Sequence, residues 1–456
     1  MEIYERLPVT WGFIILMFGD FQMQAEGQRT FFRILTLFSL PFPKNRAEYE
    51  RTDMETIKWV KNELPKTPDD ELAIMSVKEV EKARAFHQSF PQYTVTPLQK
   101  LDHLAGFLGL GGLFCKDESY RFGLNAFKVL GGSYAIGRFV AEKTGRDISE
   151  MNYDTLTGDD LKKDFGGAVF YTATDGNHGR GVAWAANKLG QKAVVYMPKG
   201  SSKTRLENIL RENADASIKE LNYDECVRLA AAEAEKTKNG VIVQDTAWEG
   251  YEDIPSWIMQ GYGTMAMEAA EQLEEAGVKR PTHIFVQAGV GSLAGAVQGF
   301  FANLFPDNCP TTVIVEANMA DCLYKSAAAG DGRPHAVYGD MQTIMAGLAC
   351  GEPNTISWEI LKNNSAFFVS CPDWVSARGM RVLGAPVKGD PQIISGESGA
   401  VSAGLIETLM TDPEYADLKD AIGLDENSVV LFFSTEGDTD PERYRDIVWN
   451  GAFPKE

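Results

Sequence analysis

The stretch His283-Ile-Phe-Val-Gln-Ala-Gly-Val-Gly-Ser-Leu-Ala-Gly295 decides the fold class of this chain. A short apolar run predicts a buried strand, the glycines after it predict a tight turn, and the following residues predict a helix. From about residue 166 onward the same order of strand, turn and helix repeats along the sequence. The apolar runs are continuous, which is typical of parallel strands covered by helices on both faces. We therefore predict an α/β fold with doubly wound parallel sheets.

Several segments fit this pattern in each direction from residues 283–295. The predicted strands are 169–173, 193–197, 217–221, 241–244, 283–287, 312–316 and 428–433. The predicted helices are 179–189, 203–213, 223–238, 256–276 and one that begins after Gly291. A chain of 456 residues is long enough for two lobes. Ligands in such folds bind at the carboxyl ends of the strands, so the strand-to-helix turns are where a site is expected.

Composition excludes some classes of protein. The chain carries 64 acidic and 44 basic side chains, a net charge of −20, which repels phosphate backbones and argues against nucleic-acid binding. The six cysteines are scattered without a CxxC pair, so neither a disulfide scaffold nor a zinc ribbon is expected. We interpret them as inert thiols, with a redox pair of Cys322 and Cys350 as an open hypothesis. The five histidines form no HExxH pair, so no catalytic metal is predicted.

The first 53 residues differ from the rest. Their two apolar runs, 13–18 and 31–38, are shorter than the ~20 residues that a membrane helix needs. Glu2 and Glu5 stand where a signal peptide has basic residues. We therefore interpret residues 1–53 as an extension of doubtful order, with ordinary domain sequence beginning at Met54. No membrane association is expected, and we predict a cytoplasmic protein.

Four turns contain residues suited to chemistry. Lys128, in Asn125-Ala-Phe-Lys128, follows an aromatic residue at a predicted helix start, and an apolar setting makes a lysine amine a better nucleophile. A solvated surface lysine is the competing interpretation. The second turn is Asp175-Gly-Asn177-His178, where Asn177 is able to bond a ring oxygen. Asp175 is either a carboxylate of the site or a helix N-cap, and His178 is interpreted as a packing residue.

The third turn, 287–295, has backbone N–H groups at a helix N-terminus, which form a phosphate cradle. It has a rival interpretation as a dinucleotide site, because Gly289, Gly291 and Gly295 follow a strand and Glu316 closes the next one. The fourth turn begins at Ser434 and Thr435, where a neutral hydroxyl would face a pyridine nitrogen. An ordinary polar strand exit is the alternative there. Glu397, in a glycine-rich loop, is left as either a site residue or a helix cap.

In this order the four turns resemble the tryptophan synthase β and threonine dehydratase family of pyridoxal-phosphate enzymes, fold type II. Longer stretches resemble the diaminopropionate ammonia-lyases: residues 116–119, 121–128, 175–184, 244–251, 344–353 and 434–440. The resemblance extends from about residue 54 to the end. One departure is informative, because serine and threonine dehydratases usually have Ser before Gly-Asn-His, where this chain has Asp175.

The resemblance implies a cofactor, pyridoxal 5'-phosphate, and a set of residues that bind it. Lys128 is the expected Schiff-base lysine, Asn177 binds the ring oxygen, and Thr435, in preference to Ser434, meets the pyridine nitrogen. The phosphate is expected at five residues: Gly289, Val290, Gly291, Ser292 and Leu293. The resemblance also implies a homodimer, a larger cofactor-binding domain of residues 54–135 and 240–456, and a smaller α/β domain of residues 136–239.

The implied reaction is elimination of ammonia from 2,3-diaminopropionate, which yields pyruvate and two molecules of ammonia. We predict that Lys128 removes the Cα proton of the L isomer and that Asp175 removes that of the D isomer. Asp245 is predicted to hold the β-ammonium group, although it also fits a turn cap. The alternatives are a serine or threonine dehydratase, a β-replacement synthase, an NAD-dependent oxidoreductase, and a catalytically silent amino-acid sensor. Asp175 argues against the first two.

Overall fold

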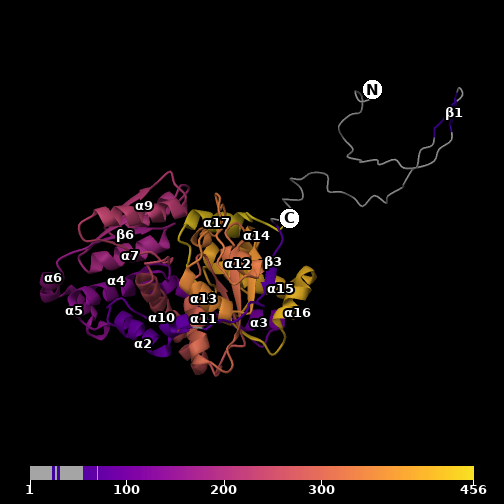
Figure 1. The fold of residues 1–456 in the computed structure, drawn as a ribbon. Coiled ribbons are helices and arrows are strands. Elements are labelled where there is room, and N and C mark those ends of the chain that lie inside the picture. The colour runs from indigo at the N-terminus through magenta and orange to yellow at the C-terminus, as the bar shows by residue number, and fades with distance from the viewer. Residues whose placement is uncertain (1–22, 26–27, 31–54, 69, 456) are drawn as a thin grey trace. The chain divides into compact units, whose positions relative to one another are not determined.

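The computed structural model describes residues 23–25, 28–30, 55–68 and 70–455. The chain divides into two compact units, Met1–Asp53 and Met54–Glu456. In the first unit, β1 (Met23–Ala25) pairs with β2 (Gln28–Thr30) in antiparallel register. The rest of the predicted extension, residues 1–53, lies outside the described residues. The second unit contains two sheets (Figure 1).

The seven-stranded sheet, called the large sheet here, has a parallel centre and antiparallel edges. Its strands, in spatial order, are β3 (Lys58–Lys61), β12 (Phe367–Cys371), β11 (Thr311–Ala317), β10 (His283–Gln287), β13 (Val429–Ser434), β5 (Gly112–Asp117) and β4 (Leu98–Lys100). Only β3 and β4 run antiparallel to their neighbours. The predicted strands at 283–287, 312–316 and 428–433 are confirmed as β10, β11 and β13.

The four-stranded sheet, called the small sheet here, is parallel throughout. Its order is β8 (Asp215–Ile218), β7 (Lys192–Met197), β6 (Val169–Ala173) and β9 (Gly240–Ile242). The strand predicted at 217–221 begins and ends earlier. The small sheet extends past residue 239, where the smaller domain was predicted to end, and the domain limits remain a prediction.

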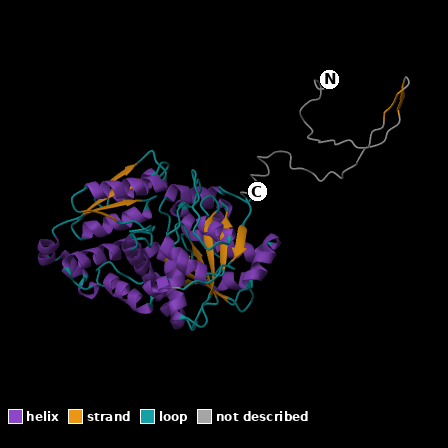
Figure 2. Cartoon of the chain, in the orientation of Figure 1, coloured by secondary structure: helices purple, strands orange, loops and turns teal. Residues whose placement is uncertain are grey.

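Helices pack on both sides of the sheets (Figures 1 and 2). The helices are α2 (Val77–Gln88), α3 (Asp102–Leu108), α4 (Val129–Thr144), α5 (Tyr153–Thr157), α6 (Asp159–Phe165), α7 (Asn177–Lys188), α8 (Lys203–Leu210), α9 (Tyr223–Lys236), α10 (Asp253–Glu275), α11 (Ser292–Leu304), α12 (Cys322–Ala329), α13 (Thr355–Asn364), α14 (Asp373–Gly384), α15 (Glu397–Thr411), α16 (Ala416–Ile422) and α17 (Pro441–Asn450). Among the described residues, no helix has both the length and the apolar content needed to cross a bilayer.

Alternate residues of the large-sheet strands face two separate cores. In β10, Ile284 and Val286 pack in one core, whereas Phe285 packs in the other. The first core also contains residues of α4, α10 and α11, and the second contains residues of α14 and α15. A sheet with a core on each face is what the continuous apolar runs predicted, so the doubly wound α/β fold is confirmed.

Two central strands were missed by the sequence analysis. β5 ends in Lys116 and Asp117, and these charges interrupt the apolar run by which a buried strand is recognised. Both side chains are nonetheless buried. β12 (Phe367–Cys371) is fully buried, but no glycine-rich turn follows it to mark its end.

A cluster of four buried charges explains how β5 tolerates a lysine. Arg121 donates two hydrogen bonds to the Glu268 carboxylate, at 2.9 and 2.7 Å, and Lys116 lies 2.8 Å from it. Glu118 pairs with Arg121 at 2.8 Å, and all four side chains are buried. Burial alone would raise the pKa of Glu268, but the two cations outweigh it and lower that pKa to about 2. The stability contributed by this carboxylate is therefore complete above its ordinary pKa of 4.5 and is lost as the pH falls towards 2.

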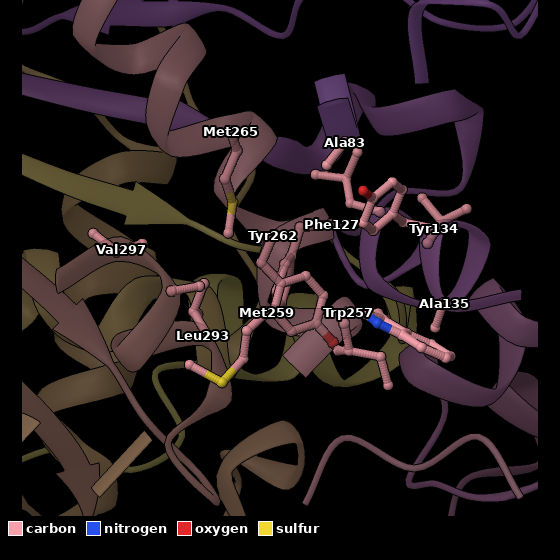
Figure 3. Close-up of a cluster of buried hydrophobic side chains, with 14 of the residues drawn as sticks. Ala83, Phe127, Tyr134, Ala135, Trp257, Met259, Tyr262, Met265, Leu293 and Val297 are labelled. Carbon is pink, nitrogen blue, oxygen red and sulfur yellow. The ribbon is translucent and has the colours of Figure 1, made fainter. Parts of the chain in front are cut away.

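The buried charges hold α10 against the segment that leads to Lys128. Glu268 lies on α10, and one turn and a half earlier Tyr262 packs on Phe127, with ring centroids 4.7 Å apart. Figure 3 shows these two rings with Met259 and Leu293 beside them. Gly261 lets α10 approach α4 closely, since a Cβ there would lie 2.5 Å from the Leu130 carbonyl oxygen. The start of α4, and with it Lys128, is therefore fixed by α10.

We expect Glu268→Ala to lower the free energy of unfolding by about 3–5 kcal/mol, because the change leaves the charges of Arg121 and Lys116 buried without this carboxylate. Urea denaturation followed by circular dichroism measures the change. The matched control is Glu271→Ala on the same helix, whose carboxylate pairs with Arg84 and is half exposed. That variant should cost less than about 1 kcal/mol. Equal losses in both variants would contradict a special role for the buried cluster.

Candidate active site

One cavity brings together nearly all the residues that the sequence analysis selected. It is lined by Lys128, Asn177, Asp245, Thr435 and the turn of residues 289–293. Asn177 and Asp245 follow strands β6 and β9 of the small sheet, whereas the turn and Thr435 follow β10 and β13 of the large sheet. The cavity therefore lies where the carboxyl ends of strands from both sheets meet, as expected for this fold class. Asp175 is not among the residues that line it.

Lys128 and Asp245 form an ion pair in the cavity. The Lys128 amine donates a hydrogen bond of 2.7 Å to Asp245 Oδ2, and the Asp245 side chain is only 3% exposed. Burial by itself lowers the pKa of Lys128, but the carboxylate outweighs it and the pKa is raised. Burial by itself raises the pKa of Asp245, but the lysine outweighs it and that pKa falls to about 2. The apolar setting that the sequence analysis expected around Lys128 thus also contains a carboxylate, which pairs with the amine.

His178 packs beside this pair. Its Nε2 is 2.9 Å from the Val243 carbonyl oxygen, and its Nδ1 is 4.0 Å from Asp245 Oδ2. Burial lowers the pKa of His178, although Asp245 opposes the shift. The ring is therefore a neutral, buried support for the strand end that carries Asp245, which agrees with its interpretation as a packing residue.

The turn between β10 and α11 presents backbone N–H groups to the cavity. Gly291 is the N-cap of α11 with a φ of 106°, and a Cβ at this position would lie 2.6 Å from Ser357 Oγ. Only glycine fits that conformation and that space. Ser292 donates a short hydrogen bond from its hydroxyl to the Asp245 carbonyl oxygen. The turn at the helix N-terminus is thereby joined directly to the segment that carries Asp245.

Thr435, rather than Ser434, faces the cavity. Thr435 Oγ1 accepts a hydrogen bond of 3.0 Å from Gln287 Nε2, whereas the Ser434 hydroxyl donates to Ser395. Because Gln287 occupies a lone pair of the Thr435 oxygen, the hydroxyl proton remains to be donated to an acceptor in the cavity. Asn177 donates a short hydrogen bond from Nδ2 to Glu436. This bond to a buried carboxylate fixes the orientation of the Asn177 amide group.

Asp175 lies at the edge of a second cavity that adjoins the first. Its Oδ2 accepts a hydrogen bond of 3.1 Å from Arg205 Nη1. The N-cap of α7 is Gly176, and no side chain caps this helix, so the interpretation of Asp175 as an N-cap is wrong. Gly347 lines the first cavity, and a Cβ on it would lie 3.9 Å from Asp175 Oδ2. Asp175 is therefore one residue removed from the lysine cavity.

Glu397 was left as either a site residue or a helix cap, and Glu316 was the acidic residue of the rival dinucleotide interpretation. The surroundings of both residues bear on these interpretations. Glu397 is the first residue of α15, is 2% exposed, and lies 3.8 Å from Arg205 Nη2. Burial raises the pKa of Glu397 to about 7, although Arg205 opposes the shift. Glu316 accepts hydrogen bonds from the backbone nitrogens of Leu323 and Tyr324, at 2.9 and 2.6 Å, at the start of α12. It lines neither cavity, so the acidic residue of the dinucleotide interpretation is a buried cap.

The cysteines carry no bridge in the structure. All six are free thiols, and five of them are buried. The hypothetical partners Cys322 and Cys350 both lie near the glycine turn. Cys322 Sγ is 3.7 Å from the Gly289 carbonyl oxygen, and Cys350 lines the lysine cavity.

Several cavity residues were not selected from the sequence. Tyr262 comes from the middle of α10, Gln287 is the last residue of β10, and Glu436 follows Thr435. Gln287 and Glu436 stand beside motifs that were recognised, so adjacency to a predicted turn was an available signal. Arg205 had none, because it reaches Asp175 from another helix, α8, thirty positions away.

The sequence profile of the family described as "Pyridoxal-phosphate dependent enzyme" matches residues 90–433. The cavity fits this cofactor in three respects: a lysine amine at Lys128 that lines it, a glycine-rich helix N-terminus that suits a phosphate, and a hydroxyl proton at Thr435. The cofactor of the chain is pyridoxal phosphate.

Curated relatives cover most of the chain. A "Diaminopropionate ammonia-lyase" of Salmonella typhimurium is 56% identical over 368 residues, which are 80% of this chain and 91% of the relative. One of Escherichia coli strain K12 is 50% identical over 379 residues, 83% of this chain and 93% of the relative.

Solved structures agree. Diaminopropionate ammonia lyase from Escherichia coli, in complex with an aminoacrylate-PLP azomethine reaction intermediate, has a TM-score of 0.80 and 46% identity, and the match covers 88% of this chain and 99% of that one. The same enzyme in complex with D-serine also has a TM-score of 0.80, with 45% identity over 88% of this chain and 99% of that one. Threonine deaminase from Solanum lycopersicum, at 18% identity and a TM-score of 0.64, shares the fold. The chain therefore belongs to the diaminopropionate ammonia-lyases, pyridoxal-phosphate-dependent lyases of fold type II.

Proposed function

We propose that the chain converts 2,3-diaminopropionate, as both the L and the D isomer, to pyruvate and two molecules of ammonia. The observation that carries the proposal is the ion pair of Lys128 and Asp245, in which a buried carboxylate holds an ammonium group inside the cavity. The activity named for both curated relatives supports the substrate. The complex of a solved relative with D-serine supports access for a D isomer.

The cofactor would be held by residues that line the cavity. We assign the Schiff base to Lys128, the ring oxygen to Asn177, and the pyridine nitrogen to Thr435. The phosphate is assigned to the turn of Gly289, Val290, Gly291, Ser292 and Leu293 at the start of α11. A neutral Thr435 hydroxyl would donate to an unprotonated pyridine nitrogen, which would make the ring a weaker electron sink and favour elimination over transamination.

Proton removal from Cα is the first task of the protein. When bound, pyridoxal phosphate accepts the electron pair left by the broken Cα–H bond. Lys128, once its amine is released, takes the proton of the L isomer. Asp175 takes the proton of the D isomer from the side of the second cavity. Two bases in different positions are needed because the isomers present this hydrogen on opposite sides of Cα.

Expulsion of the β-amino group is the second task. The Cβ–N bond breaks with its electron pair going to nitrogen, so the group departs as neutral ammonia only if it enters this step protonated. Asp245 is ionised, buried and bonded to an ammonium group in the structure. When Lys128 no longer pairs with Asp245, the substrate's β-ammonium group can take the place of the lysine ammonium, because the two cations are chemically alike. The released aminoacrylate then hydrolyses in water to pyruvate and the second ammonia.

The homodimer and the cytoplasmic location also remain proposals. Both rest on the resemblance to the family and on the sequence of the chain rather than on a contact or a signal in the structure. Light scattering of the purified protein tests the dimer, and cell fractionation tests the location.

The central assignment is tested by labelling. We expect the purified protein to be yellow and to lose this colour on borohydride reduction, with peptide mass spectrometry locating the pyridoxyl group on Lys128. Lys128→Ala should abolish the label and ammonia release. A label on another lysine would contradict the assignment. Colour without ammonia release would indicate a sensor instead of an enzyme.

The two-base proposal is tested with Asp175→Asn. We expect kcat for D-diaminopropionate to fall by about 10²–10⁴-fold, since removing a general base costs that much. The L isomer should retain most of its kcat, because Lys128 is intact. Steady-state kinetics on the separated isomers measures both values, and unchanged cofactor absorbance is the control for folding. Equal losses on the two isomers would refute separate bases.

The ammonium-binding role is tested with Asp245→Asn. We expect KM for diaminopropionate to rise by about 10- to 100-fold, because the amide keeps an acceptor oxygen but loses the charge that strengthens its bond to an ammonium group. KM for serine should rise less, because its β-hydroxyl carries no charge. The measurement is KM for both substrates with the same enzyme preparation. A larger effect on serine would rule out Asp245 as the ammonium site.

A further inference from the structure

Arg205 occupies an unusual position behind Asp175. It lies on α8 with a side chain 7% exposed, and its stem crosses over Gly176, where a Cβ would lie 3.0–3.3 Å from three of its carbons. Any larger residue at position 176 would therefore press on this side chain. Because Gly176 directly follows Asp175, the stem of Arg205 packs on the backbone segment that carries this carboxylate.

The Arg205 guanidinium group contacts two separate parts of the chain. Nη1 donates to Asp175 Oδ2 at 3.1 Å, and Nη2 lies 3.8 Å from Glu397 Oε2 and 3.4 Å from Thr439 Oγ1. Asp175 belongs to the turn after β6 of the small sheet, whereas Glu397 begins α15 against the large sheet. Arg205 thus fixes the Asp175 side chain relative to elements that surround the lysine cavity.

The charges around Arg205 account for its orientation. Burial alone would lower the pKa of Arg205, but the carboxylates of Asp175, Glu436 and Glu397 outweigh it and raise that pKa. The arginine therefore remains a cation. Asp175 is its most exposed ion-pair partner, with a side chain 17% exposed, whereas Glu397 is 3% exposed. Arg205 therefore bridges the buried Glu397 and the more exposed Asp175.

We propose that Arg205 is a positioning residue for the D-isomer reaction, which orients Asp175 so that one carboxylate oxygen faces the substrate. The inference rests on the proposed role of Asp175 as the base. Among the described residues, the side-chain hydrogen bond to Asp175 engages Oδ2 only, which leaves Oδ1 to accept a proton. A carboxylate clamped at one oxygen loses rotational freedom and presents the other in a fixed direction.

The position of Arg205 makes its role testable with the two substrate isomers. Arg205 lies outside the lysine cavity, so its loss should leave the L-isomer reaction of Lys128 intact. A purely structural clamp between the two sheets would instead affect both isomers alike. The ratio of D to L activity therefore separates the two roles.

The test uses the holoenzyme and two substitutions. We expect Arg205→Gln to lower kcat for D-diaminopropionate by about 100-fold, as misplacement of a reacting group does, with kcat for the L isomer near that of the parent. Arg205→Lys should restore part of the D activity, since it keeps the cation. The control is Arg180→Gln on α7, which removes a partly buried pair with Glu212 and should leave the D to L ratio unchanged.

A double variant completes the test. Asp175→Asn combined with Arg205→Gln should be no slower on the D isomer than Asp175→Asn alone, because the arginine acts through the aspartate. Equal losses on both isomers in Arg205→Gln, no loss at all, or failure of both Arg205 variants to bind the cofactor would overturn the inference. If Asp175→Asn itself lowers the activity on both isomers equally, Asp175 is not the separate base for the D isomer, and the positioning role of Arg205 is refuted as well. If Asp175→Asn discriminates and Arg205→Gln does not, only this inference fails.

Discussion

The buried cluster of Glu268 with Arg121 and Lys116 is the interaction on which the geometry of the site depends. It joins the end of β5 to α10 in the part of the chain that leads to Lys128. Such a cluster need not be more stable than an apolar core, because the desolvation of the ions offsets their attraction. Its bidentate geometry, however, permits one register of α10 against β5. Tyr262 and Gly261, on the same helix, then place Phe127 and the first turn of α4.

The two carboxylates of the proposed chemistry lie in different surroundings. Asp245 is enclosed and faces a lysine, so it is ionised and suited to hold a cation. Asp175 is partly exposed and faces an arginine that is itself held by Glu397. The same side-chain type is thus proposed for two tasks, because the partner and the exposure differ. In both places a basic side chain and an adjacent carboxylate compensate each other's charge.

The site takes its residues from both sheets. Asp175, Asn177 and Asp245 follow strands of the small sheet, and the glycine turn and Thr435 follow strands of the large sheet. Ser292 joins the glycine turn to Asp245, and Glu436 joins Thr435's strand end to Asn177. These cross-sheet hydrogen bonds align the two sets of strand ends, so the cavity is defined by their pairing and by neither sheet alone.

Sequence by itself determined the fold class, the main parallel strands and most of the cavity, since these are local properties. A continuous apolar run followed by a glycine turn is visible wherever it occurs, and Asn177, Gly291 and Thr435 all belong to such turns. Lys128 was selected from the aromatic residue before it and the predicted helix after it. β5 was not predicted because Lys116 interrupts its apolar run. The carboxylate that pairs with Lys116, Glu268, is distant in sequence. Only the tertiary structure decided that Lys128 carries a paired charge, that Asp175 is no helix cap, and that Arg205 stands behind it. Each depends on a charge brought within hydrogen-bonding distance by packing, which local sequence does not encode.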